Sequence, residues 1–353
     1  MNAVDLFAGA GGWSHGWRIA TGSDPLLAVD HCPHAVQVHS ANHPGTEHFL
    51  QDVWSVDPAA AVAGRSVDWL HGSPDCRHFS RAMGSKPRED RIRGLAWVLL
   101  DWAHATRPQF LSLENVPEFK TWGPLDDEGH PIKARAGETF AVFVAALRSL
   151  GYAVDWRVLC AADFGAPTIR RRLFLVGRRD GLPIRWPEPT HADPSNRGML
   201  QPWRTAAECI DWAIPCPSIF DRKRPLAPAT RRRIDEGIVR FVQQKACSSF
   251  LMQYYGSGGQ HSSVDAPLPA VVTKARHSLV TVAMDGAHPV LSAIGMRMLA
   301  PRELARAQGF PDSYVLNGTT EQQIARVGNS VVPQVAAAIV RANLGLEARE
   351  VKP

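Results

Sequence analysis

The sequence feature that most constrains the fold is a glycine-rich segment near the start of the chain, residues 8–12, called here the glycine turn. Residues 4–7 before it predict a short strand, and a helix is expected from Trp13 to about Ala20. Such an arrangement opens a nucleotide-binding βαβ unit, because glycine lets the backbone approach a ligand closely. The dinucleotide fingerprint would need a third glycine where Ser14 stands, so a tight turn without a ligand is the alternative.

Two further predicted strands, residues 26–30 and 47–52, each end in an acidic residue. Asp30 comes about 20 residues after the glycines, where an acid accepts hydrogen bonds from ribose hydroxyls. With Asp52 at the end of the next strand, the pair suits a ligand that has a ribose and an amino-purine edge. The alternative is that both carboxylates only cap the helices that follow them.

A single cysteine, Cys76, follows the next predicted strand at residues 66–70. A thiol on a loop at the carboxyl end of a strand is where an α/β enzyme would place a nucleophile. A small buried hydrophobic residue is the alternative. The basic residues in the loop after it favour a phosphate-rich partner or, alternatively, a solvated loop; they are Arg81, Lys86, Arg88, Arg91 and Arg93.

A carboxylate and two arginines are expected at the same edge of the sheet. Glu114 ends the predicted strand at residues 110–113, and Arg170-Arg171-Arg172 precedes an apolar strand. Alternation along a strand sends Arg170 and Arg172 to one face, where they can orient an anionic or carbonyl-bearing group. A salt-bridged strand start is the alternative.

The composition changes in the middle of the chain, which predicts two domains. Residues 181–293 are rich in Pro, Trp, Ser and Gly, and the strand–helix alternation stops there. We expect a discontinuous larger domain, residues 1–180 and 294–353, with this segment inserted as a smaller one. Basic clusters at 222–224 and 231–233 and the polar loop at 254–261 favour contact with nucleic acid, although a charged helix face would also explain the clusters.

Composition excludes several other classes of protein. The 353 residues are 45% hydrophobic, without an apolar run long enough to cross a bilayer and without a basic leader, so we expect a cytoplasmic location. The net charge of +5 fits a polyanionic partner. Neither a metal site nor a disulfide framework is expected, because the six cysteines have no CxxC spacing: Cys32, Cys76, Cys160, Cys209, Cys216 and Cys247.

The order of these features resembles the C5-cytosine DNA methyltransferase family. The segments that carry the resemblance are residues 5–12 (DLFAGAGG), 72–80 around the cysteine, Glu114-Asn115-Val116, 166–177, 301–311 (PRELARAQGFP) and 323–333 (QIARVGNSVVP). The resemblance implies a doubly wound, mostly parallel α/β sheet with the Rossmann-like fold of class I AdoMet-dependent methyltransferases. The middle segment would then be an inserted target-recognition domain.

The resemblance also implies a role for each matched residue. Cys76 would attack C6 of a cytosine flipped out of duplex DNA, which makes C5 nucleophilic. Glu114 would hydrogen-bond and protonate N3, Arg172 would hold O2, and Arg170 would support the site. The S-adenosyl-L-methionine site, which would release S-adenosyl-L-homocysteine, would be formed by Phe7, Gly9, Gly11, Asp30, His31, Asp52, Val53, Asn329 and Ser330.

The same resemblance implies a monomer that acts on double-stranded DNA, with a cognate restriction endonuclease as a further partner. Four positions depart from the family pattern: Asp75 and Arg77 flank the cysteine in place of Pro and Gln, Thr168 replaces a Gln, and His31 replaces a Trp. Asp75 should raise the pKa of the thiol and Arg77 should lower it. A tRNA methyltransferase, a DNA-binding homologue with weak catalysis and a nicotinamide oxidoreductase remain as alternatives.

Overall fold

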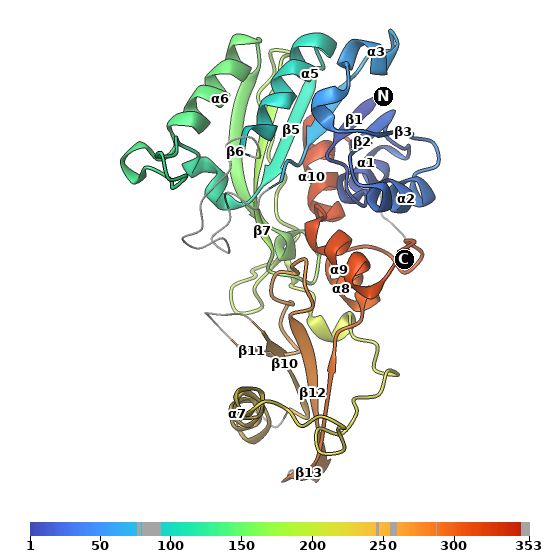
Figure 1. The fold of residues 1–353 in the computed structure, drawn as a ribbon, viewed down its shortest axis with the longest axis vertical. Helices are drawn as coiled ribbons and strands as arrows, with labels where there is room; N and C mark the ends of the chain where they lie inside the picture. The colour runs from blue at the N-terminus through green and yellow to red at the C-terminus, as the bar shows by residue number, and fades with distance from the viewer. Residues whose placement is uncertain (76–78, 80–92, 245–246, 255–259, 287, 347–353) are drawn as a thin grey trace.

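The computed structural model describes residues 1–346 except 76–78, 80–92, 245–246, 255–259 and 287. Two regions are stacked along the long axis of the molecule (Figure 1). The larger region comprises residues 1–180 and 299–346, so it contains both ends of the described chain. The smaller region comprises residues 181–298 and lies below it in the figure.

The larger region is built on a seven-stranded sheet with the order β3-β2-β1-β4-β5-β7-β6. The strands β1 to β5 are parallel to their neighbours, and β7 is antiparallel to both β5 and β6. The strands are β1 Ala3–Leu6, β2 Leu27–Asp30, β3 Glu47–Leu50, β4 Trp69–Gly72, β5 Phe110–Asn115, β6 Ala153–Cys160 and β7 Arg171–Arg178.

Helices cover both faces of this sheet, so its central strands are buried on both sides. One face carries α1 (Gly12–Thr21) and α10 (Pro333–Leu344), which pack so closely that a Cβ at Gly16 would lie 2.5 Å from Cβ of Ala336. The other face carries α3 (Pro58–Val62), α5 (Val98–Thr106) and α6 (Glu138–Ser149). The remaining helices are α2 (Pro33–Asn42), α8 (Pro301–Ala307) and α9 (Thr320–Asn329), with 3₁₀ segments at Val53–Ser55, Gly94–Trp97, Pro117–Thr121, Lys133–Arg135 and Ala161–Phe164.

The smaller region is built on a four-stranded antiparallel sheet that is covered on both faces. Its strand order is β11-β10-β12-β13, and its elements are β8 His191–Ala192, β9 Gln201–Pro202, η7 Ala206–Glu208, α7 Pro228–Gly237, η8 Ile238–Gln243, β10 Ser249–Gln253, β11 His261–Ser262, β12 His277–Asp285 and β13 His288–Met298. One face packs on α7 and η8. The other face shares a core with the larger region, in which Leu251 and Leu279 join Leu304 and Val327.

The structure confirms the predicted α/β class and places the ends of some strands differently from the prediction. The strand predicted at 66–70 is β4, Trp69–Gly72, because pairing with β1 begins where Ala3 faces Trp69. Glu114 lies inside β5 and not after it, since β7 pairs as far as Asn115. Asn329 is the last residue of α9. The predicted domain boundary at 293/294 falls within β13, which stays paired with β12 up to Met298.

Within the described part of the chain, no helix is both long enough and apolar enough to cross a membrane. A search of the same residues finds no group of three or more His, Cys, Asp or Glu side chains that could hold a metal ion.

Candidate active site

The predicted site residues gather at one edge of the larger sheet. Three neighbouring strands end there in register, with Leu6 beside Gly72 and Gly72 beside Leu113. Because β7 runs antiparallel to β5, its first residues lie at this same edge. The segments that follow β1, β4 and β5 and the segment that precedes β7 are therefore neighbours, at the place where open α/β sheets bind ligands.

The glycine turn leaves room for a ligand on one side. Phe7, Gly9 and Gly11 have φ values of 60°, 57° and 86°, in the left-handed region that glycine adopts without strain. A Cβ at Gly9 would meet only the carbonyl oxygen of Phe7, at 3.9 Å, so this position faces open space. At Gly11 a Cβ would lie 2.7 Å from the hydroxyl of Tyr314, so this glycine is needed for packing.

The predicted ribose acceptor, Asp30, also holds the glycine turn. Its Oδ2 accepts a hydrogen bond from N–H of Gly9 at 2.9 Å, and its Oδ1 accepts one from N–H of Cys32 at 2.8 Å. Each oxygen keeps a second lone pair, so contact with a ribose hydroxyl is compatible with both bonds. The following helix, α2, has no side-chain cap at its N-terminus, so Asp30 holds the loop before the helix and does not cap it.

The other predicted cofactor residues differ in how far they are buried. Val53 is buried, while Asp52 is exposed and its Oδ1 accepts from N–H of Trp54, which caps the short 3₁₀ segment. The side chain of His31 is 81% exposed, beside Asp30, so it forms no closed wall. His31 would cover an adenine stacked at this place only if binding of the ligand ordered the exposed imidazole ring of His31.

The segment 323–333, which lies near the other end of the sequence, packs against the end of the glycine turn. Ser330 is buried, and its Cβ lies 3.1 Å from where a Cβ of Gly12 would stand. The carbonyl oxygen of Val331 is closer still, at 2.2 Å from that position, so only glycine fits at residue 12. Asn329 is exposed at the end of α9. The helix turn that carries Asn329 and Ser330 is thus placed against the start of α1.

Cys76 and Arg77 lie outside the described residues, but the segment that leads to them is anchored. N–H of Ser73 donates to the carbonyl of Leu6 at 3.2 Å, and Nδ2 of Asn115 donates to the carbonyl of Pro74 at 3.0 Å. The chain is therefore held to β1 and β5 two residues before the cysteine. Sequence reasoning did not assign Asn115 a role, although its position directly after Glu114 was a usable signal.

Glu114 is a buried carboxyl group facing two arginines. Its Oε1 lies 3.2 Å from Nε of Arg172, and Arg170 is the second positive charge that acts on it, as the alternation of the strand predicts. Burial raises the pKa of Glu114 above its usual range, and the charges of Arg172 and Arg170 partly oppose that rise. Among the described residues, Oε1 of Glu114 accepts no hydrogen bond, and its charged neighbour is Arg172.

Arg170 also connects the two regions of the molecule. It is buried, and its Nη1 donates to the carbonyl of Val271 at 2.9 Å. Just before it, N–H of Ile169 donates to the carbonyl of Leu268 at 3.0 Å. The side chain that faces Glu114 is therefore fixed by backbone from the smaller region.

A chain of buried polar side chains lies beneath the glycine turn. The hydroxyl of Ser14 donates to Oδ2 of Asp5 at 2.6 Å, Nε2 of His39 lies 2.9 Å from that hydroxyl, and Nδ1 of His39 lies 2.7 Å from Nε2 of His48. Burial, more than any other cause, raises the pKa of Asp5 to about 7 and holds the pKa of His39 well below its usual range. No local sequence pattern predicts this cluster, because its members come from four separate elements.

Comparisons with known proteins agree with this fold. The model of the family of C-5 cytosine-specific DNA methylases matches residues 1–344. The type II methyltransferase M1.HphI of Haemophilus parahaemolyticus is 28% identical over 364 aligned positions, which cover 99% of this chain and 88% of the relative. The type II methyltransferase M.AquIA of Picosynechococcus is 32% identical over 228 positions, which cover 60% of this chain and 88% of the relative.

Solved structures support the fold independently. A protein from an E. coli prophage, described as a DNA modification methyltransferase, aligns with a TM-score of 0.65 and 22% identity, over 98% of this chain and 99% of the other. Spodoptera frugiperda DNMT2 aligns with a TM-score of 0.65 and 16% identity, over 98% of this chain and 100% of the other. At these identities the likeness concerns the fold, which is the Rossmann-like fold of class I methyltransferases with an additional region.

The family match over nearly the whole chain, on a sheet of this order, shows that the chain belongs to the C-5 cytosine-specific DNA methylases. It is accordingly an enzyme, a DNA (cytosine-5)-methyltransferase, whose relatives include type II modification methyltransferases.

Proposed function

We propose that the chain methylates C5 of a flipped-out cytosine in a specific sequence of duplex DNA, through a covalent bond between Cys76 and C6 of the base. The observation that carries this proposal is Glu114. It is a buried carboxyl group with a raised pKa, its Oε1 lies 3.2 Å from Nε of Arg172, and it stands at the strand edge that leads to Cys76. A neutral carboxyl group can donate to N3 of cytosine, as the reaction needs when charge develops on the ring.

Each side chain has one task in this proposal. The thiolate of Cys76 adds to C6 and is later eliminated, while a base removes the proton from C5. Glu114 hydrogen-bonds N3, and Arg172 holds O2 of the base. Arg170 supports the site, and its own side chain is fixed by its bond to the carbonyl of Val271. Asn115 fixes the segment before Cys76 through the carbonyl of Pro74.

The open side of the glycine turn fits S-adenosyl-L-methionine. That cofactor supplies an electrophilic methyl group and leaves as S-adenosyl-L-homocysteine. Gly9 faces open space there, and the acids at the ends of β2 and β3 suit a ribose and an amino-purine edge. The residues that would hold the cofactor are Phe7, Gly9, Gly11, Asp30, His31, Asp52, Val53, Asn329 and Ser330.

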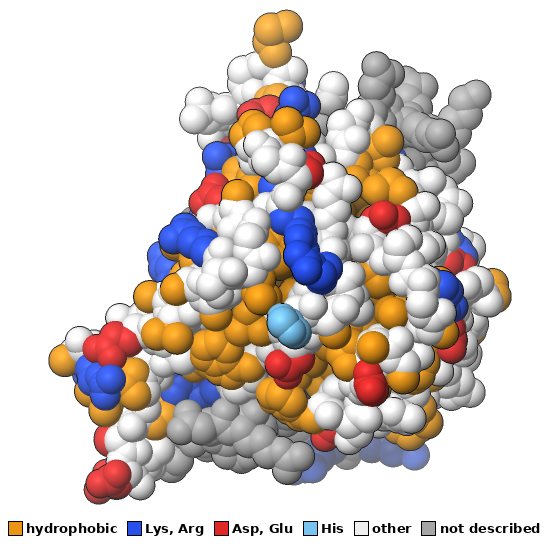
Figure 2. All heavy atoms as spheres, turned by 90° about the horizontal axis from the view of Figure 1, so that it is seen from above, with side chains coloured by type: hydrophobic (Ala, Val, Ile, Leu, Met, Phe, Trp, Pro, Cys, Tyr) orange, Lys and Arg blue, Asp and Glu red, His pale blue; other side chains and the backbone are white. Residues whose placement is uncertain are grey.

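The charge distribution supports the smaller region as the part that binds DNA. Residues 181–298 contain fourteen Lys and Arg against nine Asp and Glu, a balance of +5, which equals the net charge of the whole chain. Duplex DNA attracts such a surface through its phosphates. In the larger region acidic and basic side chains are mixed, and Figure 2 shows both kinds scattered over the end remote from the smaller region.

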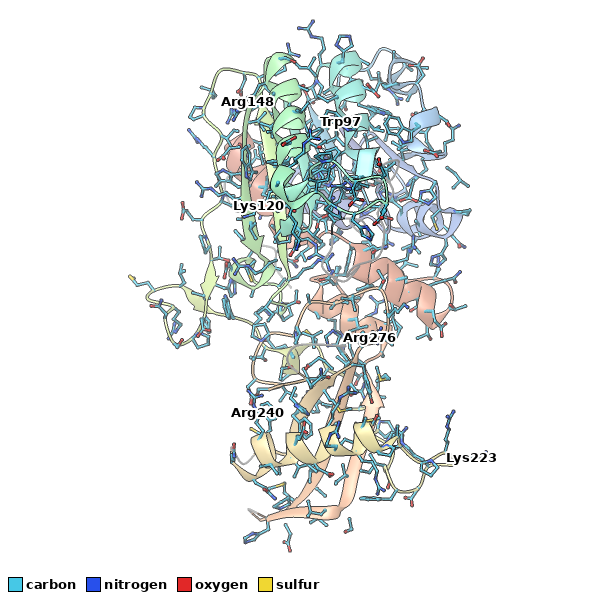
Figure 3. All side chains as sticks on the ribbon, turned by 60° about the vertical axis from the view of Figure 1, so that its left-hand side comes forward. Trp97, Lys120, Arg148, Lys223, Arg240 and Arg276 are labelled. Carbon is cyan, nitrogen blue, oxygen red and sulfur yellow. The ribbon has the colours of Figure 1, made fainter. Side chains whose placement is uncertain are left out.

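We propose that DNA follows a strip of side chains in the smaller region that leads away from the larger region. The strip consists of Arg276, Tyr254, Arg233 and Arg240. Nη1 of Arg276 donates to the carbonyl of Tyr254 at 2.9 Å, and Cζ of Arg233 lies 5.8 Å from the centre of the Tyr254 ring. Figure 3 shows Arg276 close to the larger region and Arg240 farther along, on the segment after α7. Lys274 is exposed beside this strip, where it can meet a phosphate.

We also propose that the enzyme acts as a monomer in the cytoplasm, alongside a cognate restriction endonuclease. The names of its type II relatives support the last point, because such enzymes belong to restriction–modification pairs. Restriction by extracts of the source cells, tested on DNA that the enzyme has or has not methylated, would reveal the endonuclease.

Bisulfite sequencing of DNA from cells that express the chain tests the proposed function. We expect one short sequence context in which cytosine becomes protected, and no protection with Cys76→Ala. Duplex DNA with 5-fluorocytosine at that site should trap the wild-type protein covalently and should not trap the variant. Methylation by Cys76→Ala would overturn the covalent mechanism, and methyl transfer to tRNA but not to duplex DNA would overturn the substrate.

A further inference from the structure

One buried residue far from the glycine turn in sequence contacts the turn directly. Tyr314 lies between α8 and α9, is 3% exposed, and donates its hydroxyl hydrogen to the carbonyl of Ala10 in the turn. Its ring packs on Phe310 and His15, with centroids 4.5 and 5.2 Å away. The segment is fixed independently, since Asn42 bonds both N–H and C=O of Val315 at 2.8 and 3.0 Å.

A second set of polar groups stands behind the tyrosine. Nε2 of His43 lies 3.3 Å from the Tyr314 hydroxyl, and Nδ1 of His43 lies 2.9 Å from Oδ1 of Asp24. Arg18 in turn donates to Asp24 at 2.6 Å. A carboxylate only accepts hydrogen bonds, so Nδ1 of His43 carries a hydrogen and the orientation of its ring is set.

These contacts give Gly9 and Gly11, two of the three glycines of the turn, different neighbours. The place of a Cβ at Gly11 is taken by the Tyr314 hydroxyl at 2.7 Å and by Nε2 of His43 at 2.9 Å. Gly9, two residues earlier, faces open space. The tyrosine thus contacts the turn at Gly11, while the side of the turn at Gly9 is open for the cofactor.

We propose that Tyr314, held by its bond to Ala10 and packed against Phe310, His15 and His43, is a positioning residue that keeps the glycine turn in the shape that binds the cofactor. The inference rests on the proposed cofactor site, and it assigns part of the cofactor affinity to a residue that does not touch the cofactor. The phenol hydrogen restrains the carbonyl of Ala10, and with it the left-handed conformations on either side of that residue. Without that bond the turn has more conformations to lose when the cofactor binds.

The test uses Tyr314→Phe, which keeps the ring and removes only the hydroxyl. Tyr152→Phe is the matched control: Tyr152 is also 3% exposed, and its hydroxyl also donates to a backbone carbonyl, that of Pro108, at 2.7 Å. Both variants lose one buried hydrogen bond of the same kind, so a general loss of stability is matched between them.

Two measurements on the full-length protein separate the outcomes. Hydrogen exchange of the peptide that contains residues 7–12, without cofactor, should be faster in Tyr314→Phe and unchanged in Tyr152→Phe. Calorimetric titration with S-adenosyl-L-homocysteine should give a Kd about three- to tenfold weaker for Tyr314→Phe alone, the worth of one hydrogen bond. The affinity for DNA should stay the same in both variants.

Unchanged exchange in Tyr314→Phe, or an equal loss of affinity in both variants, would overturn the inference. If exchange increases in Tyr314→Phe but the wild-type protein binds no S-adenosyl-L-homocysteine, the restraint on the turn is supported and the proposed cofactor is the part that fails.

Discussion

The two regions of this enzyme differ in how their sheets place residues. In the larger region parallel strands bring their carboxyl ends to one edge, so residues from the glycine turn, from β5 and from the start of β7 meet within a small volume. In the smaller region the antiparallel strands carry few charged side chains, and many of the basic ones lie on α7 and the segments on either side of it. The larger region has no net charge, whereas the smaller region has +5. In the function proposed above, buried geometry serves the chemistry and surface charge serves the binding of a polyanion.

The largest expected effect tests the chemistry of the larger region. Glu114→Gln keeps the shape of the side chain but removes a proton that can be transferred, so kcat should fall by about 10²- to 10⁴-fold. The KM for DNA should change little, because Glu114 is not part of the basic surface. Steady-state kinetics with labelled cofactor and duplex DNA measure both values.

The control for that variant is Glu128→Gln, whose side chain is 84% exposed on a surface turn. It should keep wild-type kcat. If Glu114→Gln and the wild-type enzyme had equal kcat, the buried carboxyl group would have no part in the reaction.

A second prediction concerns the dependence of stability on pH in the larger region. The pKa of Asp5 is raised to about 7 by burial, above its value near 4 in the unfolded chain. The folded state therefore keeps this proton longer, and the free energy of unfolding falls as the pH rises from about 4 to beyond 7, by up to ~4 kcal/mol. Asp5→Asn, which does not titrate, should remove that part of the pH dependence, as measured by urea unfolding at pH 5, 6.5 and 8.

The control is Asp101→Asn, which removes an exposed carboxyl group on α5. If Asp5→Asn lost stability from pH 5 to 8 as steeply as the wild type, the raised pKa would be wrong.

The smallest expected effect belongs to the smaller region. Lys274→Gln removes one exposed charge beside the DNA-binding strip, so the slope of log K against log salt should become shallower by about one. Fluorescence anisotropy with duplex DNA at several salt concentrations measures the slope. Single-turnover rates at saturating DNA should not change.

Arg148→Gln is the control for this variant, because Arg148 lies on α6 in the larger region, far from the strip in Figure 3. An identical change of slope in both variants would show that position on the surface does not matter, and would remove the distinction between the regions.

Much of the larger region could be predicted from sequence because its signals are local. The glycine turn, the acids at strand ends and the alternation of Arg170 and Arg172 all lie within a few residues of the elements that they mark. Tyr314 could not be found in this way, since its partner Ala10 is 304 positions away and the contact exists only after α8 and α9 have packed. Of the smaller region only the change of composition, the basic clusters and the polar loop were predicted. Its strand pairing was not, because pairs such as Phe250 opposite Val280 join residues 30 positions apart that no local pattern connects.

The antiparallel course of β7 has a consequence for how this enzyme can vary. The ladder between β5 and β7 sets Glu114 opposite Phe174, so the carboxyl group and Arg172 stay in register however long the chain between them is. That intervening chain includes the turn at residues 124–131, where the backbone of Leu125 pairs with that of Pro131. Insertions or deletions at this turn would lengthen or shorten a loop and leave the proposed catalytic pair where it is. The proposed reaction is thereby insulated from changes in the length of this turn.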